Sequence, residues 1–149
     1  MSVGIDESLL VMTRIFDAPP ERVFDAWMEH GQFESWIGPE GVKCEVPVME
    51  PKVGGRYRVD MKMSDGTPIP VSGVYQTIER PKRIVFTWGW DGDPDRTSTI
   101  TLTFQALGDK TKLTLRQEGL KTVENRDGHN KGWTGAFNKL AGYLAKESA

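Results

Sequence analysis

Residues 131–146 read KGWTGAFNKLAGYLAK, and this stretch near the C-terminus decides the predicted fold. Its large apolar side chains recur at i, i+4, i+7 and i+11, a spacing that places them in one narrow stripe on an α-helix. They are Trp133, Phe137, Leu140 and Leu144. A helix of about 16 residues is ~24 Å long and ~10–12 Å wide, so it covers only roughly two or three strands. We therefore expect a long helix against a sheet that it cannot cover completely, with a cavity between the two.

The chain before this helix alternates between inward and outward positions, the pattern of half-buried antiparallel strands. Residues 73–118 form strand after strand in this pattern. The predicted inward positions are Tyr57, Val59, Met61 and Met63; Ile84, Phe86, Trp88 and Trp90; Ile100, Leu102 and Phe104; and Leu113, Leu115 and Gln117. Turn signals separate the strands at Asp65-Gly66, Arg80-Pro81-Lys82 and Gly108-Asp109.

The N-terminal region predicts one strand followed by two short helices. The strand covers residues 9–16, and the first helix starts at Pro20, where the missing N–H of proline costs nothing. We expect this helix to end near His30, with Gly31 as its C-cap, and a second helix to cover residues 32–36. The polar residues 121–130 predict a loop before the last helix. Because no β-α-β alternation occurs, the sequence favours an α+β domain with one antiparallel sheet over residues 1–149.

Composition excludes several classes of partner. The 149 residues carry 19 basic and 21 acidic side chains, for a net charge of -2, and the two signs are interspersed. Nucleic-acid binding normally needs a clustered basic surface, so we expect none. The apolar run at residues 9–12 is too short for a signal peptide, and no stretch approaches the ~20 residues of a membrane span. Cys44 is the single cysteine, so no disulfide within the chain is possible, and we expect a cytoplasmic protein.

Several motifs resemble those of one protein family, in the same order and over nearly the whole chain. They are residues 17–27 (DAPPERVFDAW), 33–41 (FESWIGPEG), 54–58 (GGRYR), 73–75 (GVY), 83–88 (RIVFTW), 101–104 (TLTF), 118–120 (EGL) and 132–133 (GW). The chain thus resembles the activator-of-heat-shock-ATPase-like branch of the START/polyketide-cyclase superfamily. The resemblance implies a helix-grip fold, in which a curved antiparallel sheet of about six or seven strands wraps around the C-terminal helix.

The resemblance also implies a hydrophobic cavity that binds lipids, polyketides or similar apolar molecules, and in a few members performs cyclisation or hydration. One position departs from the pattern. Similar proteins often carry a histidine just before the Glu-Gly pair, where this chain has Gln117. Glutamine does not exchange protons near neutral pH, which argues against acid–base chemistry at this position.

The predicted ligand-binding residues face inward from the strands and the last helix. They are Tyr57, Val59, Met61, Phe86, Trp88, Leu102, Phe104, Leu115, Gln117, Trp133 and Phe137. Each of these side chains fits a packed core as well as a pocket wall. Tyr57, Trp88 and Gln117 have polar tips that need hydrogen-bond partners when buried, and a ligand or a trapped water could supply them.

Other candidate sites are weaker, and we expect no metal or cofactor. Residues 91–95 (DGDPD) begin like a calcium loop, but Arg96 and Leu102 replace its required glycine and terminal acid, so a solvated hairpin loop is favoured. His30 and His129 fall in predicted loops without a ligand-spaced partner. Cys44 faces inward between Val42 and Val46, where a thiol is usually inert packing. Gly135 and Gly142 are interpreted as solvent-facing positions of the last helix.

Three functions follow, in decreasing order of support. The first is a non-catalytic or only weakly catalytic carrier or sensor of a small apolar ligand. The second is an activator of a ninety-kilodalton heat-shock chaperone ATPase, as the resemblance suggests. The third is a cyclase or hydratase with Tyr57 or Glu118 as acid or base, although the strand alternation points Glu118 outward. Exposed strand edges also allow a homodimer.

Overall fold

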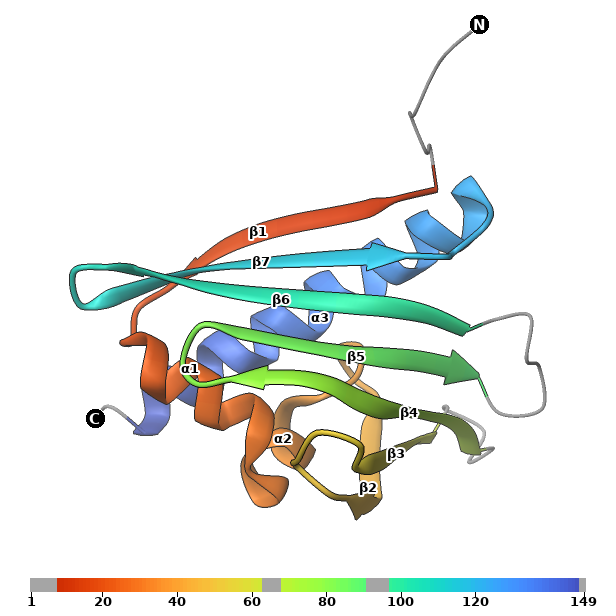
Figure 1. Ribbon diagram of the computed structural model, residues 1–149, viewed down its shortest axis with the longest axis horizontal. Helices are drawn as coiled ribbons and strands as arrows, with labels where there is room; N and C mark the ends of the chain where they lie inside the picture. The colour runs from red at the N-terminus through yellow and green to blue at the C-terminus, as the bar shows by residue number, and fades with distance from the viewer. Residues whose placement is uncertain (1–7, 63–67, 91–96, 148–149) are drawn as a thin grey trace, which may run out of the picture.

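The computed structural model describes residues 8–62, 68–90 and 97–147, which form a seven-stranded sheet and three helices (Figure 1). The elements in chain order are β1 (Leu10–Phe16), α1 (Pro20–Met28), α2 (His30–Trp36), β2 (Lys43–Met49), β3 (Arg56–Lys62), β4 (Pro68–Glu79), β5 (Arg83–Trp90), β6 (Thr97–Leu107), β7 (Lys110–Glu118) and α3 (Val123–Glu147). The strand order is β1-β7-β6-β5-β4-β3-β2, and every neighbouring pair is antiparallel. The predicted α+β helix-grip fold is confirmed.

Strand alternation is confirmed for the predicted inward residues that the structure describes, except that Trp90 at the end of β5 is only partly buried. Tyr57, Val59 and Met61 of β3 are buried, as are the inward residues of β6 and β7. The register of β6 and β7 places inward residues opposite one another, with Leu102 paired to Leu115 and Ile100 paired to Gln117. The predicted turns at Arg80-Pro81-Lys82 and Gly108-Asp109 join β4 to β5 and β6 to β7. Met63, the Asp65-Gly66 turn and the candidate calcium loop lie outside the described residues.

Helix α3 runs across one face of the sheet, from near the end of β7 to the region of α1 (Figure 1). Its predicted apolar stripe is buried, with Leu140 completely inaccessible to solvent. Phe137 packs edge-on against Phe16 of β1, with ring centroids 5.8 Å apart. The stripe therefore fixes the helix to the sheet as the sequence predicted.

The beginning of α3 corrects the sequence prediction, because residues 123–130 are helical and not a loop. The hydroxyl of Thr122 accepts a hydrogen bond from the N–H of Asn125 at 3.1 Å, which is N-cap geometry. The Asn125 side chain donates to the carbonyl of Leu120 at 3.0 Å. These first turns lie past the end of β7 (Figure 1). They carry no apolar stripe, so periodicity alone could not detect them.

The boundary between the N-terminal helices also differs from the prediction. Helix α1 starts at Pro20 as expected but ends at Met28, and Glu29 is extended with φ -94° and ψ 129°. Gly31 lies inside α2 and is not a C-cap. The two helices are tied by the Trp36 indole, which donates to the carbonyl of Ala26 at 2.9 Å.

Gly135 is buried, so its interpretation as a solvent-facing residue was wrong. A β-carbon at this position would lie 2.8 Å from the backbone nitrogen of Glu40, so only glycine lets α3 approach the segment after α2 this closely. Gly142 is exposed with nothing within 4 Å, as predicted.

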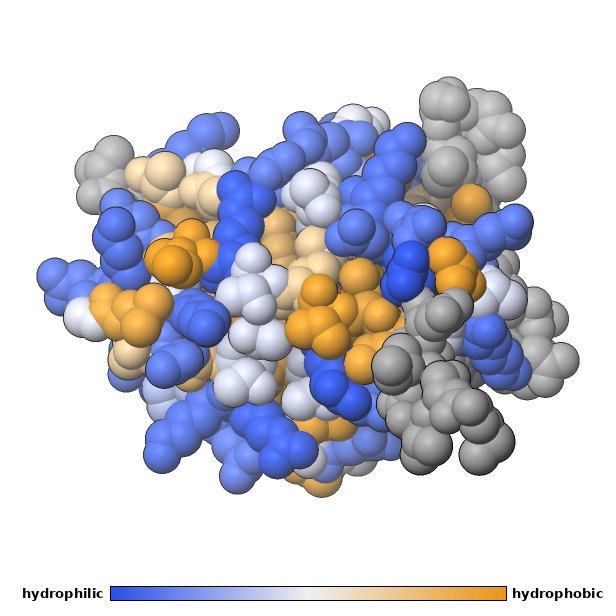
Figure 2. Space-filling view, turned by 90° about the horizontal axis from the view of Figure 1, so that it is seen from above, coloured by the Kyte–Doolittle hydropathy of each residue, from blue (hydrophilic) through white to orange (hydrophobic). Residues whose placement is uncertain are grey.

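The two edge strands are β1 and β2. On the outer side of β1, Val11 and Ile15 are 52% and 57% exposed. Figure 2 shows the molecule from above, where polar residues separate several apolar patches. Apolar residues scattered in this way are normal for a protein surface. A homodimer through a strand edge remains a prediction.

Candidate ligand pocket

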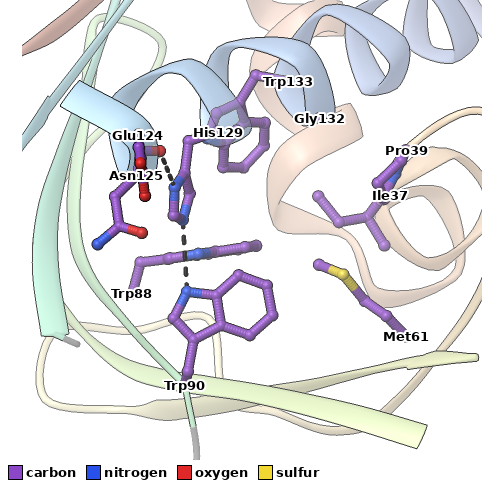
Figure 3. Close-up of a pocket in the computed structure, with 12 residues that line it drawn as sticks. Ile37, Pro39, Met61, Trp88, Trp90, Glu124, Asn125, His129, Gly132 and Trp133 are labelled. Atoms are coloured by element: carbon purple, nitrogen blue, oxygen red, sulfur yellow. Dashed lines mark hydrogen bonds between the residues drawn. The ribbon is translucent and has the colours of Figure 1, made fainter. Parts of the chain in front are cut away.

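A pocket of about 240 Å³ lies at one end of the sheet, beside the first turns of α3. Its walls come from the segment after α2, from β3, from the end of β5 and from α3 (Figure 3). The lining residues are Ile37, Gly38, Pro39, Met61, Trp88, Trp90, Glu124, Asn125, Gly128, His129, Gly132 and Trp133. The pocket is thus assembled from segments far apart in the sequence.

Tryptophan rings form the inner wall of the pocket. The Trp88 and Trp133 ring centroids are 5.0 Å apart with planes tilted by 52°, and Trp90 meets Trp88 edge-on at 6.3 Å. Figure 3 shows Ile37, Pro39 and Met61 across the cavity from these rings. Such a wall is held by packing on several sides, and it offers a ligand flat apolar surface.

The polar part of the lining comes from the first turns of α3. Nδ1 of His129 lies 2.7 Å from the backbone oxygen of Asn125, and Nε2 lies 3.4 Å from the indole nitrogen of Trp90 (Figure 3). A carbonyl oxygen only accepts and an indole N–H only donates, so Nδ1 carries the proton and Nε2 accepts. His129 is therefore a neutral imidazole in this arrangement. It lies on α3 and not in the predicted loop.

The side chain of Trp88 lines the pocket, but its indole nitrogen is buried behind the pocket surface. Its ring is only 3% exposed, and its indole N–H has no hydrogen-bond partner in the described part of the chain. A buried donor without an acceptor costs about 1–3 kcal/mol.

The predicted ligand-binding residues divide into three groups. Met61, Trp88 and Trp133 line the pocket, whereas Tyr57 and Phe86 line a separate void of about 10 Å³ under α1 and α2. The remaining predicted residues are buried in the core and line neither space: Val59, Leu102, Phe104, Leu115, Gln117 and Phe137. The expected cavity is thus confined to one end of the helix–sheet interface.

The side chain of Gln117 is hydrogen-bonded to other buried side chains of the protein. Its amide nitrogen donates to the hydroxyl of Ser98 at 2.8 Å, and its amide oxygen accepts from the indole of Trp133 at 2.9 Å. All three groups are buried. Gln117 therefore holds the Trp133 ring in place at the back of the pocket.

Tyr57 and Glu118, the predicted acid–base candidates, both lie outside the pocket lining. The Tyr57 hydroxyl donates to the carbonyl of Thr87 at 2.5 Å. Burial, with a smaller contribution from Tyr75, raises the pKa of Tyr57 well above its usual value. Glu118 is exposed, as predicted, and accepts a hydrogen bond from Arg116 at 3.0 Å.

Lys139 holds the segment that forms the outer wall. Its ammonium group donates to the carbonyls of Ile37, Pro39 and Val42 at 3.1, 3.3 and 3.2 Å. Burial lowers the pKa of this ammonium group. The apolar pattern of the helix gave no sign of this role.

The other candidate groups offer little chemistry. Burial raises the pKa of the Cys44 thiol to about 11, against a smaller opposite effect of Lys139, so at neutral pH it stays protonated and inert. His30 is the first residue of α2, not part of a loop, and its Nε2 lies 2.6 Å from the carbonyl of Val46. In the described residues, no three His, Cys, Asp or Glu side chains come together as a metal site.

A family model described as Activator of Hsp90 ATPase homolog 1-like protein matches residues 17–145. The chain belongs to this family. Solved structures agree: the AHSA1 protein from Silicibacter pomeroyi is 29% identical with a TM-score of 0.81, covering 93% of this chain and 99% of that one. A protein from Chromobacterium violaceum is 27% identical with a TM-score of 0.84, covering 91% and 95%.

The comparison with curated proteins gives no match. The Activator of Hsp90 ATPase homolog 1-like family and its fold support a ligand-binding or activator-like protein. No described helix has both the length and the apolar character to cross a membrane.

The residues that sequence reasoning missed are mostly on the first turns of α3. Asn125, Gly128, His129 and Gly132 have the spacing i, i+3, i+4 and i+7, which is one face of a helix. The signal that could have found them is Thr122, a favoured N-cap residue at the true start of α3.

Proposed function

We propose that this protein binds a small, mainly apolar molecule in the pocket between α3 and β5, as a carrier or sensor. The observation that carries the proposal is the pocket itself, about 240 Å³ with three tryptophans in its lining. Ligand sites are typically concave, mainly apolar and supplied with a few polar groups that orient the ligand. Asn125 and His129 are such groups here.

The pocket has walls that are held in place before any ligand arrives. Gln117 positions Trp133 and Lys139 positions the segment around Pro39. A preorganised site spends less binding free energy on ordering side chains. This supports reversible binding of a molecule that enters from solvent.

Glycines on α3 provide a direct test. A β-carbon at Gly128 would meet nothing within 4 Å, and this residue lines the pocket; Gly142 is equally open but lies elsewhere on the helix. Gly128→Leu should fill the pocket, whereas Gly142→Leu places the same side chain in solvent. Both replace glycine by a better helix former, so neither should reduce stability.

The experiment is a titration with the neutral apolar probe N-phenyl-1-naphthylamine, together with mass spectrometry of an organic extract of the purified protein. We expect saturable binding to the original protein and to Gly142→Leu, and a loss of at least tenfold in affinity for Gly128→Leu. Absence of saturable binding together with an empty extract would remove the proposal, as would equal binding by both variants.

The family description favours a second candidate, stimulation of a heat-shock chaperone ATPase. The test is ATP turnover of the cognate ninety-kilodalton chaperone with saturating amounts of this protein. A stimulation that Gly128→Leu leaves intact would place that activity on the surface and not in the pocket. Unchanged turnover with the original protein would exclude this candidate.

A further inference from the structure

We propose that β1 is a self-association surface, through which two copies of this protein pair antiparallel and join their sheets into one. The partner is a second copy, related by a twofold axis that passes beside Thr13. Three features of the molecule support this pairing: the difference between its two edge strands, the symmetry of the exposed side chains of β1, and the charges beside them. The association does not involve the pocket and is independent of the proposed function.

The edge strand β2 is protected against pairing. It contains Pro47, and a bulge interrupts its register with β3. The backbone of Val46 is already bonded to α2, since its N–H donates to the Glu34 carboxylate at 2.8 Å and its carbonyl accepts from His30 at 2.6 Å. Proline, bulges and covering groups are common ways of blocking a sheet edge.

The opposite edge strand, β1, lacks these features. It contains no proline and pairs with β7 without interruption from Leu10 to Phe16. In an antiparallel strand, alternate residues turn both N–H and C=O away from the neighbouring strand. Among the described residues, nothing pairs with β1 on its outer side, the upper edge of the sheet in Figure 1. β1 therefore offers a row of backbone donors and acceptors to a further strand.

The exposed apolar side chains of β1 are symmetric about its central residue. Val11 and Ile15 are 52% and 57% exposed, and they lie on the outer face on either side of Thr13. A twofold contact requires a self-complementary surface. With the axis at Thr13, Val11 lies opposite the partner's Ile15, and all seven residues of the strand are paired. A shifted register leaves the strand ends unpaired and breaks both contacts between valine and isoleucine.

Positive charges near this edge make the association sensitive to salt. Arg14 faces the inner side of β1, where it donates to Asn138 at 2.5 Å. In the dimer the two Arg14 residues are diagonal neighbours, about 7–8 Å apart. On the outer face, Lys112 and Arg116 of β7 flank the strand, with Arg116 paired to Glu118 at 3.0 Å. Salt should strengthen the dimer because it screens the repulsion between these cationic groups.

Sedimentation velocity over about two decades of protein concentration tests the association. A single strand edge is smaller than the interface of a stable dimer, so we expect a reversible dimer with a dissociation constant on the order of 100 μM. The dissociation constant should fall about threefold when the NaCl concentration rises from about 0.05 to about 0.5 M.

Lysine substitutions test which edge forms the contact. Val11→Lys and Ile15→Lys place a charge at the paired strand, and each should weaken the dimer at least about tenfold. Val48→Lys is the matched control, because Val48 is 40% exposed on the other edge strand. It should leave the dissociation constant nearly unchanged. Since all three residues are exposed, the urea midpoint of each variant should match that of the original protein.

Single added cysteines test the register. Thr13→Cys places two thiols opposite each other on the twofold axis, within reach of a disulfide, so oxidised glutathione should convert it to a covalent dimer. In Val11→Cys the two thiols are four residues out of register, about 14 Å apart, and should not link. The original protein is the control for Cys44, whose thiol has a raised pKa of about 11 and should not react.

Four results would overturn the proposal or its geometry. A monomer at every concentration overturns it, and so does a dimer that Val11→Lys and Ile15→Lys leave intact. A dimer that Val48→Lys weakens instead belongs to β2 and not to β1. Linking of Val11→Cys as fast as Thr13→Cys overturns the register. The response of probe binding to Gly128→Leu is a separate measurement, so failure of this proposal leaves the proposed function standing.

Discussion

The two halves of α3 form one continuous helix, but one half packs against the sheet and the other lines the pocket. Residues 133–147 carry the stripe of Trp133, Phe137, Leu140 and Leu144, none more than 4% exposed, and pack against the sheet. Residues 123–132 include Gly128 and Gly132 and line the pocket. The second half packs through large apolar side chains, whereas the first half faces the pocket with glycine and polar residues; Trp133, where the two halves meet, both packs and lines the pocket. The half that forms the site therefore gives the weaker sequence signal.

Leu140→Ala tests the packed half and should have the largest effect on stability. Leu140 is completely buried, and truncating such a residue costs about 2–5 kcal/mol through lost burial and the cavity left behind. The measurement is the free energy of unfolding from urea denaturation. Ligand affinity should change by less than about twofold, because Leu140 does not line the pocket.

The matched control is Leu107→Ala, since Leu107 is 40% exposed at the end of β6. The free energy of unfolding of this variant should fall by no more than about 0.5 kcal/mol, as for most surface substitutions. Similar losses for both variants would contradict the division of α3 into a packed half and a site half.

Lys139→Met tests how the packed half of α3 supports a wall of the pocket. Methionine keeps much of the apolar stem but cannot donate to the three carbonyls that hold residues 37–42. We expect the free energy of unfolding to fall by about 1–2 kcal/mol, since the lost bonds come from a charged but only half-buried donor. Because this segment forms a pocket wall, ligand affinity should fall about fivefold.

Lys131→Met is the control, as Lys131 is exposed on the same helix. This variant should leave the free energy of unfolding and the ligand affinity nearly unchanged. If Lys139→Met reduced stability without affecting binding, the wall would not depend on this lysine.

Sequence patterns predicted the parts of the fold in which apolar residues recur at one regular spacing. The first strand was expected at residues 9–16 and is Leu10–Phe16, and the stripe from Trp133 to Leu144 is buried as predicted. The start of α3 was missed because its turns face the pocket and solvent, so no apolar period marks them. Gly135 was misjudged because its neighbour Glu40 comes from a distant segment.

The sequence predicted the pocket less well, because its shape depends on contacts between segments that are distant in the sequence. Met61, Trp88 and Trp133 were expected and do line it, but inward-facing residues such as Leu102 and Phe104 interdigitate and leave no space. Alternation tells which side of a strand is buried. Whether buried side chains meet or leave a gap depends on contacts such as that of Lys139 with the segment around Pro39.

Thr122→Ala tests the site half and should have the smallest effect on global stability. Its hydroxyl caps α3 by accepting from the N–H of Asn125, and loss of an N-cap typically costs about 1 kcal/mol. The loss should be local: amide hydrogen exchange should speed up in residues 123–128 and not around Leu140.

Thr134→Ala is the matched control, because the Thr134 hydroxyl only donates back to the carbonyl of Asn130 in mid-helix, where alanine is the better helix former. Since Glu124 and Asn125 lie in the capped turn, Thr122→Ala should also weaken ligand binding about twofold to threefold. Uniformly faster exchange along the whole helix would mean that α3 opens as one unit, and its two halves would then be distinct in composition but not in energy.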